Sequence, residues 1–217
     1  MHQVKTLAAA AALLCSTALS SPAVWAAEDA AQGAEHNILI AYFTWADNTT
    51  AADPASVDVD ATTSASLLVP GNAARLAAWI QEEVGGTLYS IKVTEPYSSD
   101  YNICLDRAAD ERDHGIRPEI EPGPENFNSF DIVFLGYPNW WYSLPMAVES
   151  FVAEHDFSGK TVIPFCTHGT GGLARSLIDL EALLPEDCTL LKPIGIYRSE
   201  VDASRPQLME WLHGLEY

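Results

Sequence analysis

The stretch Asp131-Ile-Val-Phe-Leu-Gly-Tyr-Pro-Asn-Trp-Trp-Tyr-Ser-Leu-Pro-Met-Ala-Val-Glu-Ser-Phe151 contains a predicted strand, an aromatic loop and the beginning of a helix. Residues 132–135 are an unbroken apolar run, which is typical of a strand buried on both faces of a parallel sheet. Pro145 stands where a helix through Phe151 would take its first residue, a position that proline favours. This unit predicts an α/β fold, and the rest of the chain repeats its pattern.

Three aromatic residues, Trp140, Trp141 and Tyr142, follow the predicted strand. In open α/β sheets ligands bind beyond the carboxyl ends of the strands, and three adjacent rings favour a flat partner there. The alternative is a loop that folds back onto the core. Because two tryptophans lie between Pro138 and Pro145, the sequence favours the ligand site over this alternative.

Four further apolar runs predict strands, and the stretches between them predict helices. The predicted strands are 38–43, 87–93, 161–166 and 190–197, and the predicted helices are 73–84, 98–115, 173–184 and 204–215. Five strands that alternate with helices predict a parallel sheet covered on both faces. Unusual loops follow three of the strands, from Thr44, at 138–142 and at 167–172. We expect these loops to meet at one edge of the sheet.

The beginning of the chain predicts export. Residues 1–26 combine a single charge at Lys5, a short apolar run and small residues before the expected cleavage position, which is typical of a secretory signal peptide. The apolar run is too short to remain as a membrane anchor. We therefore expect a signal peptide over 1–26, a flexible leader over 27–36 and one domain over 37–217. The exported protein would be periplasmic or extracellular.

The chain is strongly acidic. Its 11 Lys and Arg residues and 30 Asp and Glu residues give a formal net charge of −19 at pH 7. The predicted signal peptide removes only Lys5 from this count, so the exported chain would carry about −20. Such a surface repels nucleic acid and anionic lipid. We expect no nucleic-acid partner and no stable membrane span.

Three cysteines remain after the signal peptide, Cys104, Cys166 and Cys188. An odd number in an exported protein leaves at least one free thiol or an intermolecular bond. Cys166 and Cys188 should lie at opposite edges of the sheet, too far apart for the Cα separation of about 7 Å that a disulfide allows. A bond between Cys104 and Cys166 is geometrically possible.

Cys166 and His168 also raise two minor hypotheses. One is a thiol nucleophile with His168 as its base, but no neighbouring acidic residue would orient that histidine. The other is a metal site that adds His155, but no pair of these residues has the spacing of a rigid ligand pair. We therefore predict no catalytic residue and no metal ligand.

The chain resembles the flavodoxin-like proteins in three segments that are specific when taken together. These are Ile-Leu-Ile-Ala-Tyr-Phe-Thr at 38–44, Gly-Tyr-Pro-Asn-Trp-Trp at 136–141 and Pro-Phe-Cys-Thr-His-Gly-Thr-Gly-Gly at 164–172. The resemblance covers nearly all of the mature sequence. It implies a three-layer sandwich around a five-stranded parallel sheet of order 2-1-3-4-5. It also implies that three loops at the carboxyl edge bind flavin mononucleotide (FMN).

In this family the first loop holds the phosphate with a hydroxyl-rich turn and Gly-Asn-Thr at a helix start. Thr44 matches the opening hydroxyl. The motif either continues at residues 47–49, or is interrupted by an insertion over 45–69 and resumes at residues 70–73. The second register fits better because a helix follows it. There Pro70 and Ala73 replace two hydroxyl residues, so we expect weaker phosphate binding.

The resemblance implies cofactor contacts from all three loops. The predicted FMN-binding residues are Thr44, Trp45, Gly71, Asn72, Ala73, Pro138, Asn139, Trp140, Trp141, Tyr142, Thr167, His168, Gly169, Thr170 and Gly171. The implied function is electron transfer or a small flavin-dependent reductase activity outside the cytoplasm, with a redox protein or a small-molecule electron acceptor as partner. The alternative is a non-redox binding module that keeps the fold but binds another planar ligand such as a quinone.

Overall fold

A computed structural model of the chain describes residues 36–50, 67–169 and 171–217. The predicted signal peptide, nearly all of the predicted leader and most of the predicted insertion lie outside these residues. From His36 onward the described residues belong to one compact unit.

The strands form one parallel sheet with the spatial order β2-β1-β3-β4-β5. The strands are β1 (Ile38–Tyr42), β2 (Thr87–Ser90), β3 (Ile132–Pro138), β4 (Thr161–His168), β5 (Thr189–Leu190) and β6 (Ile194–Tyr197). β3 is buried along its whole length, as an apolar run in the middle of a covered sheet must be. This order and direction confirm the predicted fold class.

The fifth position of the sheet holds two short strands instead of the single strand that the sequence predicts. Both pair with β4, β5 beside its beginning and β6 beside its end. Leu190 and Ile194 stand four residues apart, whereas their partners Val162 and Phe165 stand three apart. One extra residue therefore bulges between the two strands, where Pro193 offers no backbone N–H for pairing.

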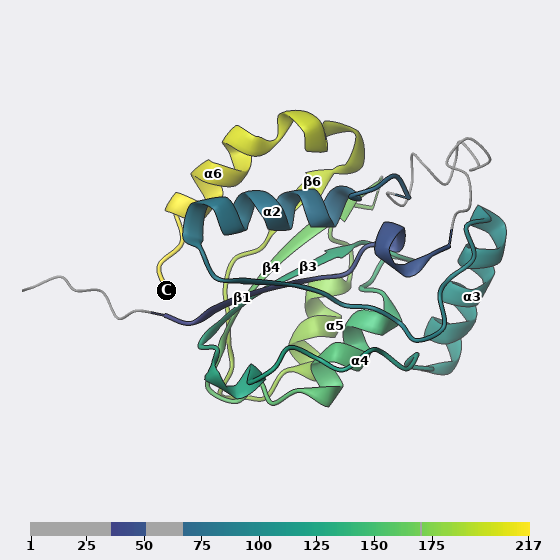
Figure 1. Cartoon of the computed structure of the whole chain (residues 1–217), viewed down its shortest axis with the longest axis horizontal. Coiled ribbons are helices and arrows are strands. Elements are labelled where there is room, and N and C mark those ends of the chain that lie inside the picture. Colours follow the sequence, from purple (N-terminus) through teal and green to yellow (C-terminus); the bar gives the residue numbers. More distant parts are fainter. Residues whose placement is uncertain (1–35, 51–66, 170) are drawn as a thin grey trace, which may run out of the picture. The chain divides into compact units, whose positions relative to one another are not determined.

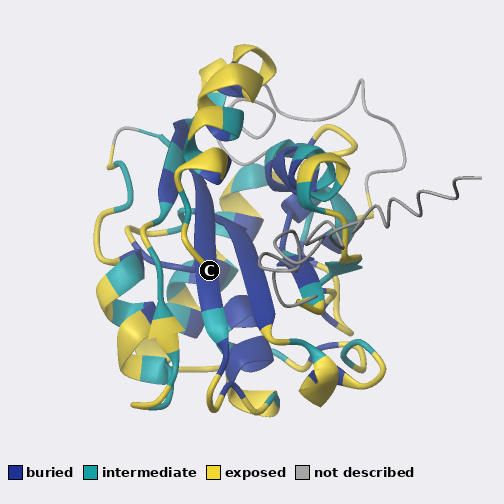
Figure 2. Ribbon diagram, turned by 90° about the vertical axis from the view of Figure 1, so that its left-hand side faces the viewer, coloured by how far each residue is buried: buried dark blue, intermediate teal, exposed yellow. Residues whose placement is uncertain are grey.

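Helices cover both faces of the sheet (Figure 1). The helices are α2 (Asn72–Val84), α3 (Tyr101–His114), α4 (Met146–Glu154), α5 (Ser176–Leu183) and α6 (Arg205–His213). α2 and α6 pack on one face, and α4 and α5 on the other. Ile40 belongs to the core under α2, and its neighbours Leu39 and Ala41 belong to the opposite core. The central strands are accordingly buried on both sides (Figure 2).

α3 lies at the side of the sheet toward which β1 runs (Figure 1). Asp100 caps its beginning by accepting a hydrogen bond from the backbone N–H of Ile103 at 3.0 Å. Gly115 ends it in the left-handed conformation, with φ of 64°. The helix is shorter than the predicted 98–115 because Asp100 serves as its cap and precedes the first helical residue.

The segment that follows β1 packs against the core as far as Asn48, which the sequence does not predict. Residues Trp45–Asn48 form a short 3-10 helix, and the Trp45 side chain is fully buried. The amide of Asn48 donates to the carbonyl oxygens of Thr44 at 2.9 Å and Ile91 at 3.0 Å. The buried indole and these hydrogen bonds hold residues 45–48 to the core, so this part of the predicted insertion over 45–69 is not a surface loop.

Candidate functional site

A cleft of about 380 Å³ lies at the carboxyl edge of the sheet, between α3 and the loops that follow the strands. We call it the edge cleft. Its lining residues are Trp45, Tyr101, Cys104, Leu105, Ala108, Asn139, Trp140, Trp141, Tyr142, Gly169, Gly171 and Arg198. Loops from all three predicted positions contribute to this lining. The volume lies in the range of sites for small ligands and cofactors.

The loop after β3 makes a two-residue turn with Trp141 and Tyr142 at its tip. Trp140 and Ser143 exchange two backbone hydrogen bonds of 2.9 Å, and the φ angles of Trp141 and Tyr142 are 50° and 66°. Positive φ at both central positions defines a type I′ turn, which normally takes asparagine and glycine. Two bulky residues in this backbone are strained, and such strain gathers at functional sites.

The turn presents two aromatic side chains at the rim of the edge cleft. Trp141 is fixed against α3, because its Nε1 donates to the carbonyl oxygen of Leu105 at 3.1 Å and its ring lies 4.7 Å below the Arg112 guanidinium. Tyr142 is 61% exposed and lies beside Gly171, where an added Cβ would come within 3.0 Å of the tyrosine ring. The two rings therefore bound the cleft from α3 to the loop after β4.

Trp140 lies deeper than its two neighbours. Its ring packs edge to face against Phe43 and Tyr97, each with ring centres 5.3 Å apart, and against Trp45 at 6.4 Å. Trp140 thus lines the edge cleft and is also anchored in the core. Its Nε1 is buried without a hydrogen-bond partner.

The first loop reaches the edge cleft through Trp45, whose Nε1 donates to the carbonyl oxygen of Ser98 at 3.1 Å. Thr44, predicted to bind phosphate, is 1% exposed and does not line the cleft. Its Oγ1 and the Nε1 of Trp140 are the buried side-chain polar atoms that lack a partner in the described part of the chain. Such orphaned atoms require an explanation, and a polar ligand is one.

Asn139 joins the second and third loops. Its backbone N–H donates to the carbonyl oxygen of Thr167 at 2.7 Å, and its side-chain amide donates to Gly172 at 2.7 Å. Gly169 and Gly171 of the third loop line the edge cleft. Predicted residue Thr170 lies outside the described residues.

Several predicted site residues do not line the edge cleft. Thr167 and Pro138 are buried at the ends of their strands. The ring of His168 lies beside Gly195 and edge-on to Tyr197, with ring centres 6.0 Å apart, because alternate residues of a strand point to opposite faces. His168 therefore lies on the β6 side of its strand rather than in the cleft lining.

Gly71, Asn72 and Ala73 lie at the start of α2, where the preferred phosphate register places a helix. Gly71 has φ of 82° and precedes the helix, and no side chain caps the first-turn N–H groups. Asn72 lies next to the loop after β6, since its side-chain amide donates to the carbonyl oxygen of Arg198 at 3.5 Å. None of the three predicted residues lines the edge cleft itself.

One wall of the cleft was not predicted from the sequence. Tyr101, Cys104, Leu105 and Ala108 of α3 lie on one helical face with spacings of three and four residues. This spacing is present in the sequence, but the helix contains so many charged residues that no apolar face was predicted for it. Arg198 was also missed, although it directly follows a predicted strand and so belongs to the same edge.

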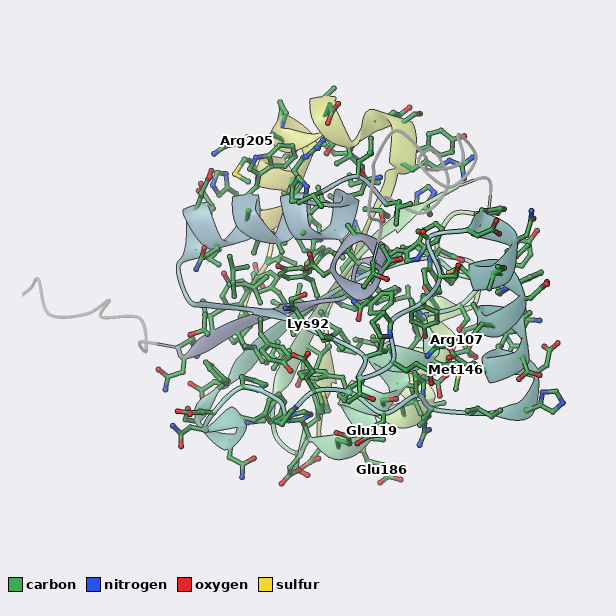
Figure 3. The ribbon with its side chains drawn as sticks, turned by 45° about the vertical axis from the view of Figure 1, so that its right-hand side comes forward. Lys92, Arg107, Glu119, Met146, Glu186 and Arg205 are labelled. Carbon is green, nitrogen blue, oxygen red and sulfur yellow. The ribbon has the colours of Figure 1, made fainter. Side chains whose placement is uncertain are left out.

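A hydrogen-bonded network supports α3 behind the edge cleft. Tyr97 donates from its hydroxyl to Glu111 Oε2 at 2.7 Å, and Arg107 donates from Nε to Glu111 Oε1 at 2.8 Å. The Arg107 guanidinium also lies 4.1 Å over the ring of Tyr97. Figure 3 shows Arg107 projecting from α3. Burial, together with the Glu111 carboxylate, raises the pKa of Tyr97 above its ordinary value.

The three cysteines are free, so the possible bond between Cys104 and Cys166 is not formed. Burial raises the pKa of Cys104 to about 12, raises that of Cys188 to about 11 and raises that of Cys166 above its ordinary value. These thiols are therefore protonated at neutral pH and are poor nucleophiles. The geometry gives no support to a Cys166 nucleophile.

The metal hypothesis also finds no support. His155 packs against Phe127 and Phe151, with ring centres 4.5 Å and 4.3 Å apart. Within the described ranges, no group of three His, Cys, Asp or Glu side chains could hold a metal ion. The helices of these ranges are also too short or too polar to cross a membrane.

Comparisons with known proteins agree with the fold. A family model described as Flavodoxin matches residues 61–214. No curated protein matches the chain. A proposed flavoprotein from Bacteroides eggerthii is 28% identical with a TM-score of 0.62, over 82% of this chain and 96% of its own.

Two further solved structures are similar. A proposed flavoprotein from Bacteroides uniformis is 25% identical, with a TM-score of 0.62 over 82% of this chain and 98% of its own. A flavoprotein in complex with FMN from Lactobacillus acidophilus is 19% identical, with a TM-score of 0.53 over 77% of this chain and 97% of its own. At that identity the last structure supports the fold alone.

Proposed function

The chain belongs to the flavodoxin family, and from that premise we propose that it binds FMN at the edge cleft and serves in electron transfer or as a small flavin-dependent reductase. FMN would supply the redox chemistry when bound. The protein would hold the flavin, orient it and limit its contact with water.

The observation that carries this proposal is the position of the two orphaned polar atoms. Thr44 Oγ1 and Trp140 Nε1 are buried without a partner, and they belong to two loops that meet at the same edge of the sheet. Trp140 lines the edge cleft, so a polar ligand bound there would lie beside its indole, whereas Thr44 does not line the cleft. The aromatic rim of Trp141 and Tyr142 beside the cleft fits a flat ring system.

Two groups of residues have chemistry that suits FMN, one for its phosphate and one for its ring. The start of α2 offers backbone N–H groups without a side-chain cap, which favour a phosphate. Trp141, Tyr142 and the backbone at Gly169 and Gly171 bound the space for the ring. One aromatic stack contributes roughly 1–3 kcal/mol, judged from stacking on nucleobases.

Titration of FMN with the purified protein tests the proposal. We expect the fluorescence of the flavin to be quenched at a stoichiometry of one to one, and the bound flavin to be reduced and reoxidised reversibly. If no quenching occurs, the redox proposal fails. A fold that binds another planar ligand, such as a quinone, would then be favoured.

Export is a further part of the proposal and rests on residues 1–26, which lie outside the described residues. The partner would be a redox protein or a small-molecule acceptor in the periplasm or outside the cell. Sequencing the amino terminus of the protein recovered from the producing cells tests this directly. A protein that begins at Ala27 is expected, whereas one that retains residues 1–26 in the cytoplasm contradicts export.

A further inference from the structure

Among the described residues that line the edge cleft, Arg198 is the one with a cationic side chain. It directly follows β6 and begins the 3-10 helix Arg198–Ala203. Its side chain lies against Gly169, where an added Cβ would come within 2.8 Å of Arg198 Nη1. The absence of a side chain at Gly169 thus leaves room for the guanidinium beside the cleft.

Arg198 also differs from the other arginines in its pairing. The chain has seven arginines, and six of them form an ion pair with a carboxylate. These six are Arg75, Arg107, Arg112, Arg117, Arg175 and Arg205. Within the described residues Arg198 has no such partner. In a chain with 30 acidic and 11 basic residues, this is unexpected unless the guanidinium has another anion to bind.

The start of α2 lies next to Arg198. The side-chain amide of Asn72 donates to the Arg198 carbonyl oxygen at 3.5 Å, and Arg75 of α2 forms an ion pair with Asp202 in the same 3-10 helix. The first-turn N–H groups of α2 have no side-chain cap. The start of α2 and the backbone of Arg198 are therefore neighbours, although only Arg198 lines the cleft, and a guanidinium and a helix N-terminus both favour an anion.

The sequence of the resumed phosphate turn explains why an arginine would be useful. In the register that resumes at residues 70–73, Pro70 and Ala73 stand where the family usually has hydroxyl residues, so two hydrogen-bond donors would be missing. A guanidinium supplies paired N–H donors that match phosphate geometry and keeps its charge at all relevant pH values. One arginine could replace both missing donors.

We propose that Arg198 binds the phosphate group of FMN and replaces the missing hydroxyl donors of the first loop. This inference rests on the proposed function. It extends that function by assigning phosphate recognition to a residue that follows the last strand of the sheet.

Parallel titrations with FMN and riboflavin test the assignment, because riboflavin has the same ring system without the phosphate. For Arg198→Gln we expect FMN binding to weaken about 10- to 100-fold, as for the loss of a hydrogen bond to a charged group. Riboflavin binding should change less than about twofold. Arg198→Lys keeps the charge but loses the paired donors. Its affinity for FMN should therefore lie between that of the wild type and that of Arg198→Gln.

Arg205→Gln is the matched control. It removes the same charge from α6 (Figure 3), where Arg205 pairs with Glu82 at 2.6 Å, and Arg205 does not line the edge cleft. We expect this variant to bind both flavins as the wild type does. Circular dichroism and thermal unfolding of Arg198→Gln should match the wild type, since no carboxylate partner is lost.

The possible outcomes separate the two proposals. If the wild type binds FMN but Arg198→Gln binds it equally well, the phosphate assignment is wrong and the proposed function stands. If Arg198→Gln loses the same affinity for FMN and for riboflavin, Arg198 contacts the flavin ring rather than the phosphate. This result would also overturn the assignment. If the wild type binds no FMN, the proposed function itself fails, and the assignment fails with it.

Discussion

Trp140 illustrates how one side chain can serve both the core and the site. Its edge-to-face contacts with Phe43 and Tyr97 anchor it, yet it also lines the edge cleft and has an unpaired Nε1. The two hypotheses for the aromatic loop, a ligand site or a loop folded onto the core, therefore both describe part of it. Trp140 turns inward, and Trp141 and Tyr142 remain at the rim.

At the residue scale, the hydroxyl of Tyr97 provides the first prediction. Tyr97→Phe keeps the aromatic contacts but removes the hydrogen bond to the buried Glu111 carboxylate. We expect the free energy of unfolding, measured in urea, to fall by about 1–3 kcal/mol because a buried acceptor loses its donor. Tyr89→Phe is the control, since its hydroxyl donates to Pro122 at an exposed site. If Tyr97→Phe and Tyr89→Phe lower the free energy of unfolding by the same amount, the burial of the acceptor does not determine the loss.

At the scale of elements, the turn after β3 and helix α3 together build the cleft. α3 reads as a polar helix, but the face formed by Tyr101, Cys104, Leu105 and Ala108 lines the cleft. Trp141 ties the turn to this helix through the Leu105 carbonyl oxygen. The cleft therefore depends on contact between two elements that are not neighbours in the sequence.

The strained turn provides the second prediction. Tyr142→Gly removes a side chain from a residue with φ of 66°, so we expect the free energy of unfolding to rise by about 1 kcal/mol. FMN binding should weaken about fivefold or more, because one stacking ring is lost. Urea unfolding and flavin titration measure the two effects. Stability gained at the expense of binding is expected where strain serves a site.

Asn126→Gly is the control for the turn. Asn126 also has positive φ, 58°, but it precedes the short helix Phe127–Ser129 and does not line the edge cleft. This variant should bind FMN as the wild type does. If Tyr142→Gly also leaves FMN binding unchanged, the Tyr142 ring does not contact the flavin.

At the scale of the whole molecule, the edge cleft contrasts with the acidic chain around it. The formal net charge is −19, yet no carboxylate belongs to the described residues that line the cleft, and Arg198 does. Charges beyond about 8–10 Å are screened at physiological ionic strength. The local groups, rather than the net charge, therefore decide whether an anion can bind there.

The buried thiols and phenols provide a third prediction, for alkaline pH. Burial raises the pKa of Cys104 from 9.0 to about 12 and also raises the pKa of Tyr97 and Tyr137. The folded state therefore holds these protons at pH values where the unfolded state releases them. Stability should be unaffected by these groups below about pH 9 and should fall above it, by up to about 1.4 kcal/mol per pH unit for each group.

Urea unfolding between pH 8 and 10.5 measures this loss. Cys104→Ala should reduce the slope of the free energy of unfolding against pH, since one titrating group is removed. Cys188→Ala should reduce it by no more than Cys104→Ala does, because that thiol is only half-buried and its pKa rises less, to about 11. A free energy of unfolding that stays constant across this range would contradict the predicted coupling.

The sequence by itself determined the alternation of strands and helices, because apolar runs, helix caps and prolines act over a few residues. Resemblance to the flavodoxin-like proteins added the order of the strands, which the structure confirms. The packing of residues 45–48 was not predicted, since the burial of Trp45 depends on residues that are distant in the chain.

Only the tertiary structure decided which predicted residues share the cleft. It turned His168 toward β6, brought α3 beside Trp141 and placed Arg198 next to the start of α2. These contacts join segments that are far apart in sequence, and they depend on how helices and loops pack once the sheet has formed. Periodicity along the chain reports the local buried face, whereas partners across such a site are set by packing in three dimensions.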